Sequence, residues 1–128
     1  MHIFDPLDRE ILPECTLELF SLAENLGLVK YLPEFERRAF IAQLSPGKGV
    51  HCPVTAPHWV KNGTEVSISF SVTFRTHSTA RIRNVHWINA HLRRLGLSPS
   101  PVGSSSWRDS SKDQVFRSLV KFKRLVAK

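Results

Sequence analysis

Residues 59–74 have the sequence WVKNGTEVSISFSVTF, and this stretch decides the predicted fold. From Val66 to Phe74, apolar residues alternate with small hydroxyl residues, which is the period-two pattern of a β-strand with two different faces. Asn62-Gly63 precedes this run, and that dipeptide favours tight hairpin turns because both of its residues tolerate positive φ. The stretch therefore predicts a hairpin whose second strand spans residues 66–74.

The polar face of the predicted strand carries no charge. It consists only of the hydroxyl side chains of Ser67, Ser69, Ser71 and Thr73. A strand face that meets solvent more often includes lysine or glutamate, so one interpretation is that this face lines a cavity. The other interpretation, a solvated sheet edge, fits the same residues and stays open.

Shorter segments of the N-terminal part support a mainly β body. Extended pieces are predicted at residues 2–4, 40–44 and 50–54, where apolar runs end at turn residues or contain proline. One short helix is predicted over residues 16–26, followed by Gly27 as its stop signal. Residues 1–76 are therefore predicted to form one β-rich domain.

The pattern becomes helical after Thr76. Apolar residues at helical spacing predict a helix that Gly96 ends; they are Val85, Ile88, Leu92 and Leu95. Residues 98–106 form a Ser/Pro/Gly linker, and Ser111-x-x-Gln114 resembles a capping box that begins a second helix. That helix is amphipathic, with an apolar stripe through Val115, Leu119, Phe122 and Val126 and a basic stripe opposite, formed by Arg117, Lys121, Arg124 and Lys128.

The formal net charge of +7 is concentrated in the C-terminal part. Residues 1–80 hold seven basic and nine acidic residues, a net of −2, whereas residues 81–128 hold eleven basic and two acidic residues, a net of +9. The basic residues could bind nucleic acid or an acidic partner through residues 81–128; the candidates are Arg81, Arg83, Arg93, Arg94, Lys121, Lys123 and Arg124. Alternatively, residues 77–128 are structural helices that cover the sheet and show a solvated basic face.

Residues 46–60 resemble a known family. Pro46-Gly47, Pro53 and Pro57-His58-Trp59-Val60, followed by the alternating run 66–74, resemble the late part of a cupin-like jelly roll of the JmjC type. The sequence departs from the family pattern at Lys48, where an acidic residue is usual, and at Ala56-Pro57, where two bulky aromatic residues are usual. The resemblance covers about residues 1–76.

The resemblance implies part of a double-stranded β-helix followed by C-terminal helices, and an Fe(II)- and 2-oxoglutarate-dependent oxygenase. It implies that His58 is the third iron ligand and that Ser71 lies near 2-oxoglutarate. The first two ligands come in this family as His-x-Asp or His-x-Glu, and neither motif occurs in this sequence. We therefore expect the C-terminal portion of a truncated oxygenase that is inactive alone and binds Fe(II) weakly or not at all.

The remaining expectations concern partners and location. Half of a barrel leaves sheet edges unpaired, so we expect the chain to self-associate, for example as a dimer. No apolar run is long enough to span a membrane, and the two cysteines, Cys15 and Cys52, fit a reducing cytoplasm. The competing function is that of a non-enzymatic basic interaction protein that uses residues 81–128.

Overall fold

The computed structural model describes residues 1–23 and 29–126. Helices account for 45% of these residues and strands for 5%, so the predicted mainly β fold, a partial double-stranded β-helix, is wrong. The chain forms two compact units, one of Met1–Pro13 with Gly27–Phe74 and one of Glu14–Leu26 with Arg75–Lys128. We refer to them as the sheet unit and the helical unit.

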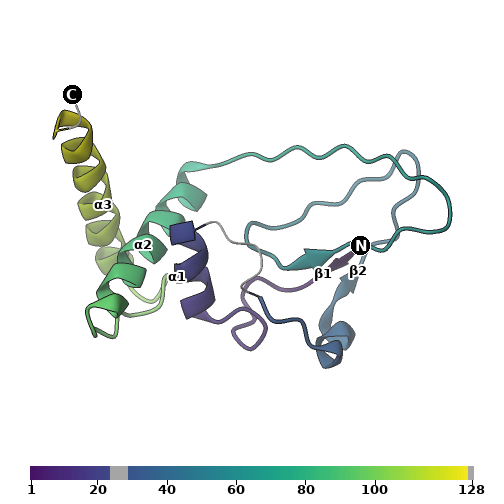
Figure 1. The fold of residues 1–128 in the computed structure, drawn as a ribbon, viewed down its shortest axis with the longest axis horizontal. Coiled ribbons are helices and arrows are strands. Elements are labelled where there is room, and N and C mark those ends of the chain that lie inside the picture. Colours follow the sequence, from purple (N-terminus) through teal and green to yellow (C-terminus); the bar gives the residue numbers. More distant parts are fainter. Residues whose placement is uncertain (24–28, 127–128) are drawn as a thin grey trace. The chain divides into compact units, whose positions relative to one another are not determined.

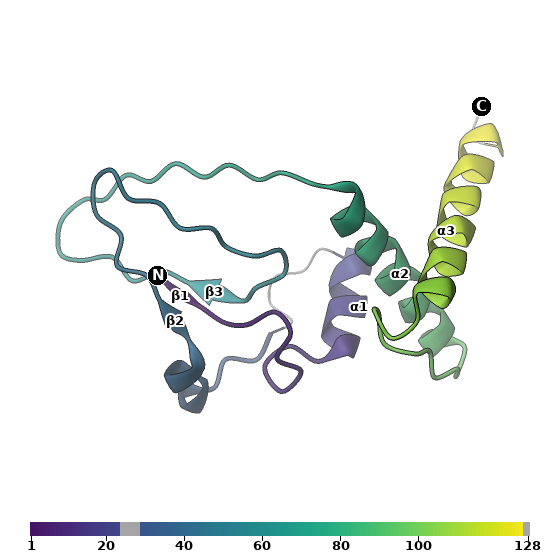
Figure 2. The same cartoon turned by 180° about the vertical axis from the view of Figure 1, so that it is seen from behind.

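The sheet unit contains a small antiparallel sheet in the order β2-β1-β3. Its strands are β1 (His2–Ile3), β2 (Phe40–Ile41) and β3 (His58–Trp59), and the short 3₁₀ helix η2 (Pro33–Arg38) precedes β2. Figure 2 shows β1 between the other two strands. Phe4, Ile11 and Phe35 form the buried core of this unit, and Leu32, Ala39 and Trp59 pack against it.

The predicted strand over residues 66–74 is not present. Among the residues that the structure describes, none pairs with this run, which Figure 1 shows as an extended tube leading toward α2. The predicted hairpin at Asn62-Gly63 is absent too, since neither residue has positive φ. A strand needs a neighbouring ladder of backbone hydrogen bonds, and β3 ends at Trp59 before it could supply one. A jelly roll cannot be built from strands of two residues.

The helical unit consists of α1 (Glu14–Ala23), α2 (His77–Arg94) and α3 (Ser106–Val126), and α2 contacts both of the others (Figure 1). Thr76 caps α2 through a capping box with Thr79. Gly96, at φ +82°, ends the helix as predicted, and the Leu97 amide donates to the Leu92 carbonyl at 3.0 Å.

Two boundaries differ from the prediction. The capping box predicted at Ser111 is wrong because α3 begins five residues earlier, at Ser106, so Ser111 lies inside the helix. The predicted helix over residues 16–26 matches α1 in part, while its expected end at Leu26-Gly27 lies outside the described residues. Within residues 1–23 and 29–126, no helix has the length and apolar character needed to cross a bilayer.

Candidate functional site

Strand β3 carries the histidine that the sequence singled out. His58 and Trp59 pair with Ile3 and His2 of β1 in antiparallel register, and the Phe4 amide donates to the Pro57 carbonyl at 2.9 Å. This short ladder fixes the backbone of residues 57–59 against β1.

The imidazole of His58 is held by one of its two nitrogens. Its Nδ1 atom lies 2.9 Å from the carbonyl oxygen of Ala56 and 3.4 Å from the Sγ atom of Cys52. A carbonyl oxygen only accepts hydrogen bonds, so the contact with Ala56 requires a proton on Nδ1. In the neutral ring, Nε2 then keeps its lone pair for a ligand. Desolvation by burial raises the pKa of the Cys52 thiol, so Cys52 is not an activated thiolate.

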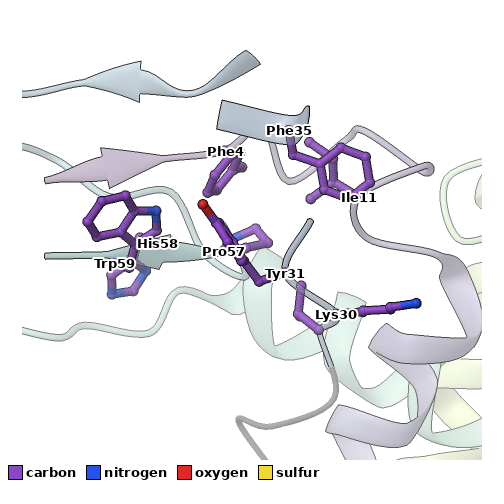
Figure 3. A pocket seen from close by; sticks show the side chains of 9 residues that line it. Phe4, Ile11, Lys30, Tyr31, Phe35, Pro57, His58 and Trp59 are labelled. Carbon is purple, nitrogen blue, oxygen red and sulfur yellow. The ribbon is translucent and has the colours of Figure 1, made fainter. Parts of the chain in front are cut away.

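A mainly apolar cavity of about 420 Å³ lies beside β3 in the sheet unit. Figure 3 shows its lining, in which Lys30 extends away from the rings of His58 and Trp59. The lining residues are Phe4, Ile11, Val29, Lys30, Tyr31, Phe35, Pro57, His58 and Trp59. The volume suits a small organic ligand, and the aromatic lining offers stacking surfaces.

Glu36 organises one edge of this region. Its carboxylate lies 2.6 Å from Nδ1 of His2 and accepts a hydrogen bond from the Trp59 indole at 2.9 Å. The rings of His2 and Trp59 stack with centroids 4.0 Å apart. Desolvation opposes the charged form, but the hydrogen bonds from Trp59, His2 and Tyr31 together hold the pKa of Glu36 below its ordinary value. The carboxylate therefore fixes the position of both stacked rings.

We expect Glu36→Gln to remove a pH dependence of the sheet unit. Because the folded pKa of Glu36 lies below the ordinary 4.5, its contribution to stability is complete above pH 4.5 and is lost as the pH falls through the folded value. In a Trp87→Phe/Trp107→Phe background, the fluorescence of Trp59 should therefore show an acid transition that Glu36→Gln lacks. The control is Glu34→Gln, a solvent-exposed carboxylate on the same helix η2. Coinciding titrations of the two variants would contradict the assignment.

Of the three iron ligands that the resemblance implies, only His58 can be assigned in this sequence. No group of three or more histidine, cysteine, aspartate or glutamate side chains in the described part of the chain could hold a metal ion. His58 is thus a single candidate ligand. Ser71 is exposed in the run 66–74 and is not among the residues that line the cavity, so the structure does not bring the two predicted site residues together at this cavity.

His2 and Glu36 were missed by the sequence analysis. They are 34 residues apart, and their link depends on the pairing of β1 with β2 and β3. Residue spacings within a single helix or strand carry no signal for a contact of this kind.

Several side chains of the basic segment have partners within the helical unit. Among them are Arg81 with Ser106 and Ser110, Arg93 with Glu18, Lys112 with Ser100, and Arg117 with Asp113. Lys121, Lys123 and Arg124 lie exposed in the last turns of α3. The cations at the end of α3 are therefore the strongest candidates for binding a partner.

Comparisons with known proteins add no relative. The scan of protein-family models, the search of curated proteins and the search of solved structures each found no match to this chain.

Proposed function

We propose that the chain is a non-enzymatic interaction protein whose helix α3 binds, through residues 115–126, an apolar groove with an acidic rim on a partner protein. One observation carries this proposal: in α3 an exposed apolar stripe lies opposite an exposed basic stripe. The apolar residues Val115, Leu119, Phe122 and Val126 are all exposed. The free thiols of Cys15 and Cys52 suit a partner in the cytoplasm.

The first half of α3 is fixed to α2. The Asn84 side chain donates to Asp113 at 2.7 Å, and Arg81 donates to the Ser110 hydroxyl at 2.8 Å. The rings of Trp87 and Phe116 meet edge to face, with centroids 5.2 Å apart. These contacts set the direction of the helix and present its second half on a rigid base.

The second half of α3 is exposed on all sides. Every residue from Arg117 to Val126 is exposed, and Phe122 keeps 66% of its surface accessible. Cations of the basic stripe follow the apolar positions by two residues, which is about 200° around a helix. No acidic residue occurs between Gln114 and Val126. Amphipathic helices of this kind bind apolar grooves by residues at i, i+4 and i+7, while their cations meet an acidic rim.

Nucleic acid explains these residues less well. Phosphates would bind the cations but would leave the apolar stripe of α3 in water. In addition, the Arg93 side chain already forms an ion pair with Glu18, so it is not placed for phosphate contacts. An apolar groove with an acidic rim satisfies both stripes at once.

Calcium-loaded calmodulin tests the proposal, because it presents a deep apolar groove with acidic edges. We expect the full chain to bind calmodulin in a calorimetric titration and Phe122→Ser to weaken binding at least tenfold, since the variant loses an anchor without a change in charge. The control is Leu7→Ser, which replaces a similarly exposed apolar residue of the sheet unit.

A DNA duplex forms the second arm of this experiment. If the chain binds DNA with a steep salt dependence that Lys121→Gln/Arg124→Gln reduces and Phe122→Ser leaves unchanged, and calmodulin does not bind, the nucleic-acid alternative is correct and the proposal fails.

The oxygenase function implied by the resemblance is a second candidate, and one observation favours it. Histidines that bind metals commonly donate a hydrogen bond from the N–H of their other ring nitrogen to a carbonyl oxygen, and Nδ1 of His58 makes such a contact with Ala56. We propose that Nε2 of His58 can serve as one Fe(II) ligand. The placement of 2-oxoglutarate near Ser71 stays a prediction.

An anaerobic titration with Fe(II) and 2-oxoglutarate tests this second candidate. We expect an absorption band of weak affinity that His58→Ala abolishes, because a single protein ligand leaves the ion largely solvated. The matched control is His51→Ala, which removes an exposed histidine seven residues earlier. A band that persists in His58→Ala, or none at all, would exclude the role of His58.

A further inference from the structure

Residues 66–74 are an extended run with no partner strand among the described residues. The apolar side chains Val66, Ile68 and Phe70 are 94%, 97% and 91% exposed, and Val72 and Phe74 are exposed as well. The run lies in the sheet unit, whereas the proposed docking helix α3 lies in the helical unit. The contact proposed for this run therefore uses residues other than those of the proposed docking helix.

We propose that residues 66–74 pair with the same residues of a second copy of this chain, as an antiparallel two-stranded ribbon with its two-fold axis at Phe70. In this register, the numbers of two residues that lie opposite each other add up to 140. Val66 then faces Phe74 and Ile68 faces Val72, so the apolar side chains of both copies share one face of the ribbon.

The hydroxyl face is matched in the same register. Ser67 lies opposite Thr73 and Ser69 opposite Ser71, pairs that can hydrogen-bond across strands. The pairing explains why the hydroxyl face of residues 67–73 carries no charge, since like charges would otherwise meet when the run pairs with its own copy. The uncharged face that could have lined a cavity is thus suited to a symmetric strand pair.

Charge at the ends of the run selects this register. Glu65 falls opposite Arg75 of the second copy, and the two-fold axis repeats this pair at the other end. A shift by two residues in either direction would place Glu65 opposite Thr73 or Arg75 opposite Ser67. A parallel arrangement in register would place Glu65 on Glu65 and Arg75 on Arg75, which is repulsive. The antiparallel register centred on Phe70 is the one that pairs all nine residues and both charges.

Disulfide trapping tests the register directly. In a Cys15→Ser/Cys52→Ser background, Phe70→Cys places two thiols opposite each other at the axis, where paired strand residues have Cα atoms about 5 Å apart, within reach of a disulfide. We expect mild oxidation to give a covalent dimer. The matched control is Ile68→Cys: its own copy lies four residues along the partner strand, about 13 Å away, and cannot be bridged.

The outcomes of this trapping separate the proposal from unspecific association. Ile68→Cys/Val72→Cys should cross-link again, since residues 68 and 72 face each other in this register. Equal cross-linking of Phe70→Cys and Ile68→Cys, or none in either, overturns the proposal.

A charge exchange tests the same ribbon without cysteines. By sedimentation equilibrium, we expect Glu65→Arg to raise the dimer dissociation constant roughly tenfold, because the symmetry creates two repulsive pairs. Glu65→Arg/Arg75→Glu restores both pairs with exchanged signs and should return the constant to that of the unchanged chain. The proposal is overturned if the unchanged chain sediments as a monomer at about 0.1 mM. It is also overturned if Arg75→Glu does not reverse the effect of Glu65→Arg.

Discussion

Arg93→Ala is expected to lower the free energy of unfolding of the helical unit by about 3 kcal/mol. Glu18 on α1 is 2% exposed, and both of its carboxylate oxygens accept hydrogen bonds from Arg93 of α2, at 2.7 and 3.0 Å. The substitution leaves a buried carboxylate without its counter-charge, and desolvation of that charge is then uncompensated. Urea unfolding followed by circular dichroism at 222 nm measures the loss.

Two further variants test whether the loss of stability comes from the ion pair between Arg93 and Glu18. Arg94→Ala removes the neighbouring, exposed arginine and should change the unfolding free energy by less than about 0.5 kcal/mol. Glu18→Leu/Arg93→Leu removes both charges and should recover much of the loss, because apolar pairs often replace buried ion pairs without cost. An Arg93→Ala variant as stable as Arg94→Ala would show that the ion pair does not hold α1 and α2 together.

Phe35→Ala is expected to destabilise the sheet unit by about 3 kcal/mol. Phe35 is buried in the core with Phe4 and Ile11, and its ring also forms part of the wall of the cavity beside β3. The lost ring leaves space that so few neighbouring side chains cannot fill. Unfolding in urea should be followed by the fluorescence of Trp59, which packs against this core, in the Trp87→Phe/Trp107→Phe background.

The control for the core substitution lies five residues further along the chain. Phe40 is a phenylalanine of strand β2 with 64% of its surface exposed. Phe40→Ala removes the same atoms but little buried area, so its effect should stay within about 0.5 kcal/mol. Equal losses for the two variants would mean that the core lies elsewhere.

The helices were largely predictable from the sequence, whereas the sheet was not. Apolar spacing from Val85 to Leu95 and the stop at Gly96 are local features, and α2 follows them closely. The alternation of apolar and hydroxyl residues over 66–74 is typical of a strand, but a strand forms only where a neighbouring strand is present. Whether a neighbour exists depends on long-range pairing, which no local pattern contains.

The site was predictable only in part, for a similar reason. His58 was expected to be an iron ligand, which stays a prediction, and the structure places it in the lining of the cavity. The side chains that organise the region, His2 and Glu36, come from distant parts of the sequence and meet through the sheet order β2-β1-β3. A sequence motif can indicate only residues whose role depends on their neighbours along the chain. A contact between strands depends on the fold, so a motif does not predict it.

The strand pairing proposed for residues 66–74 would make the degradation rate of this protein depend on its concentration. Peptide bonds in an extended segment without backbone hydrogen bonds are the ones that proteases cleave first. At low concentration the chain therefore exposes the bonds after Phe70 and Phe74 to chymotrypsin, whereas the proposed strand pairing would shield the same bonds at high concentration. Dilution alone should then accelerate cleavage at these two phenylalanines, and a degradation machine in the cell would remove single copies before paired ones.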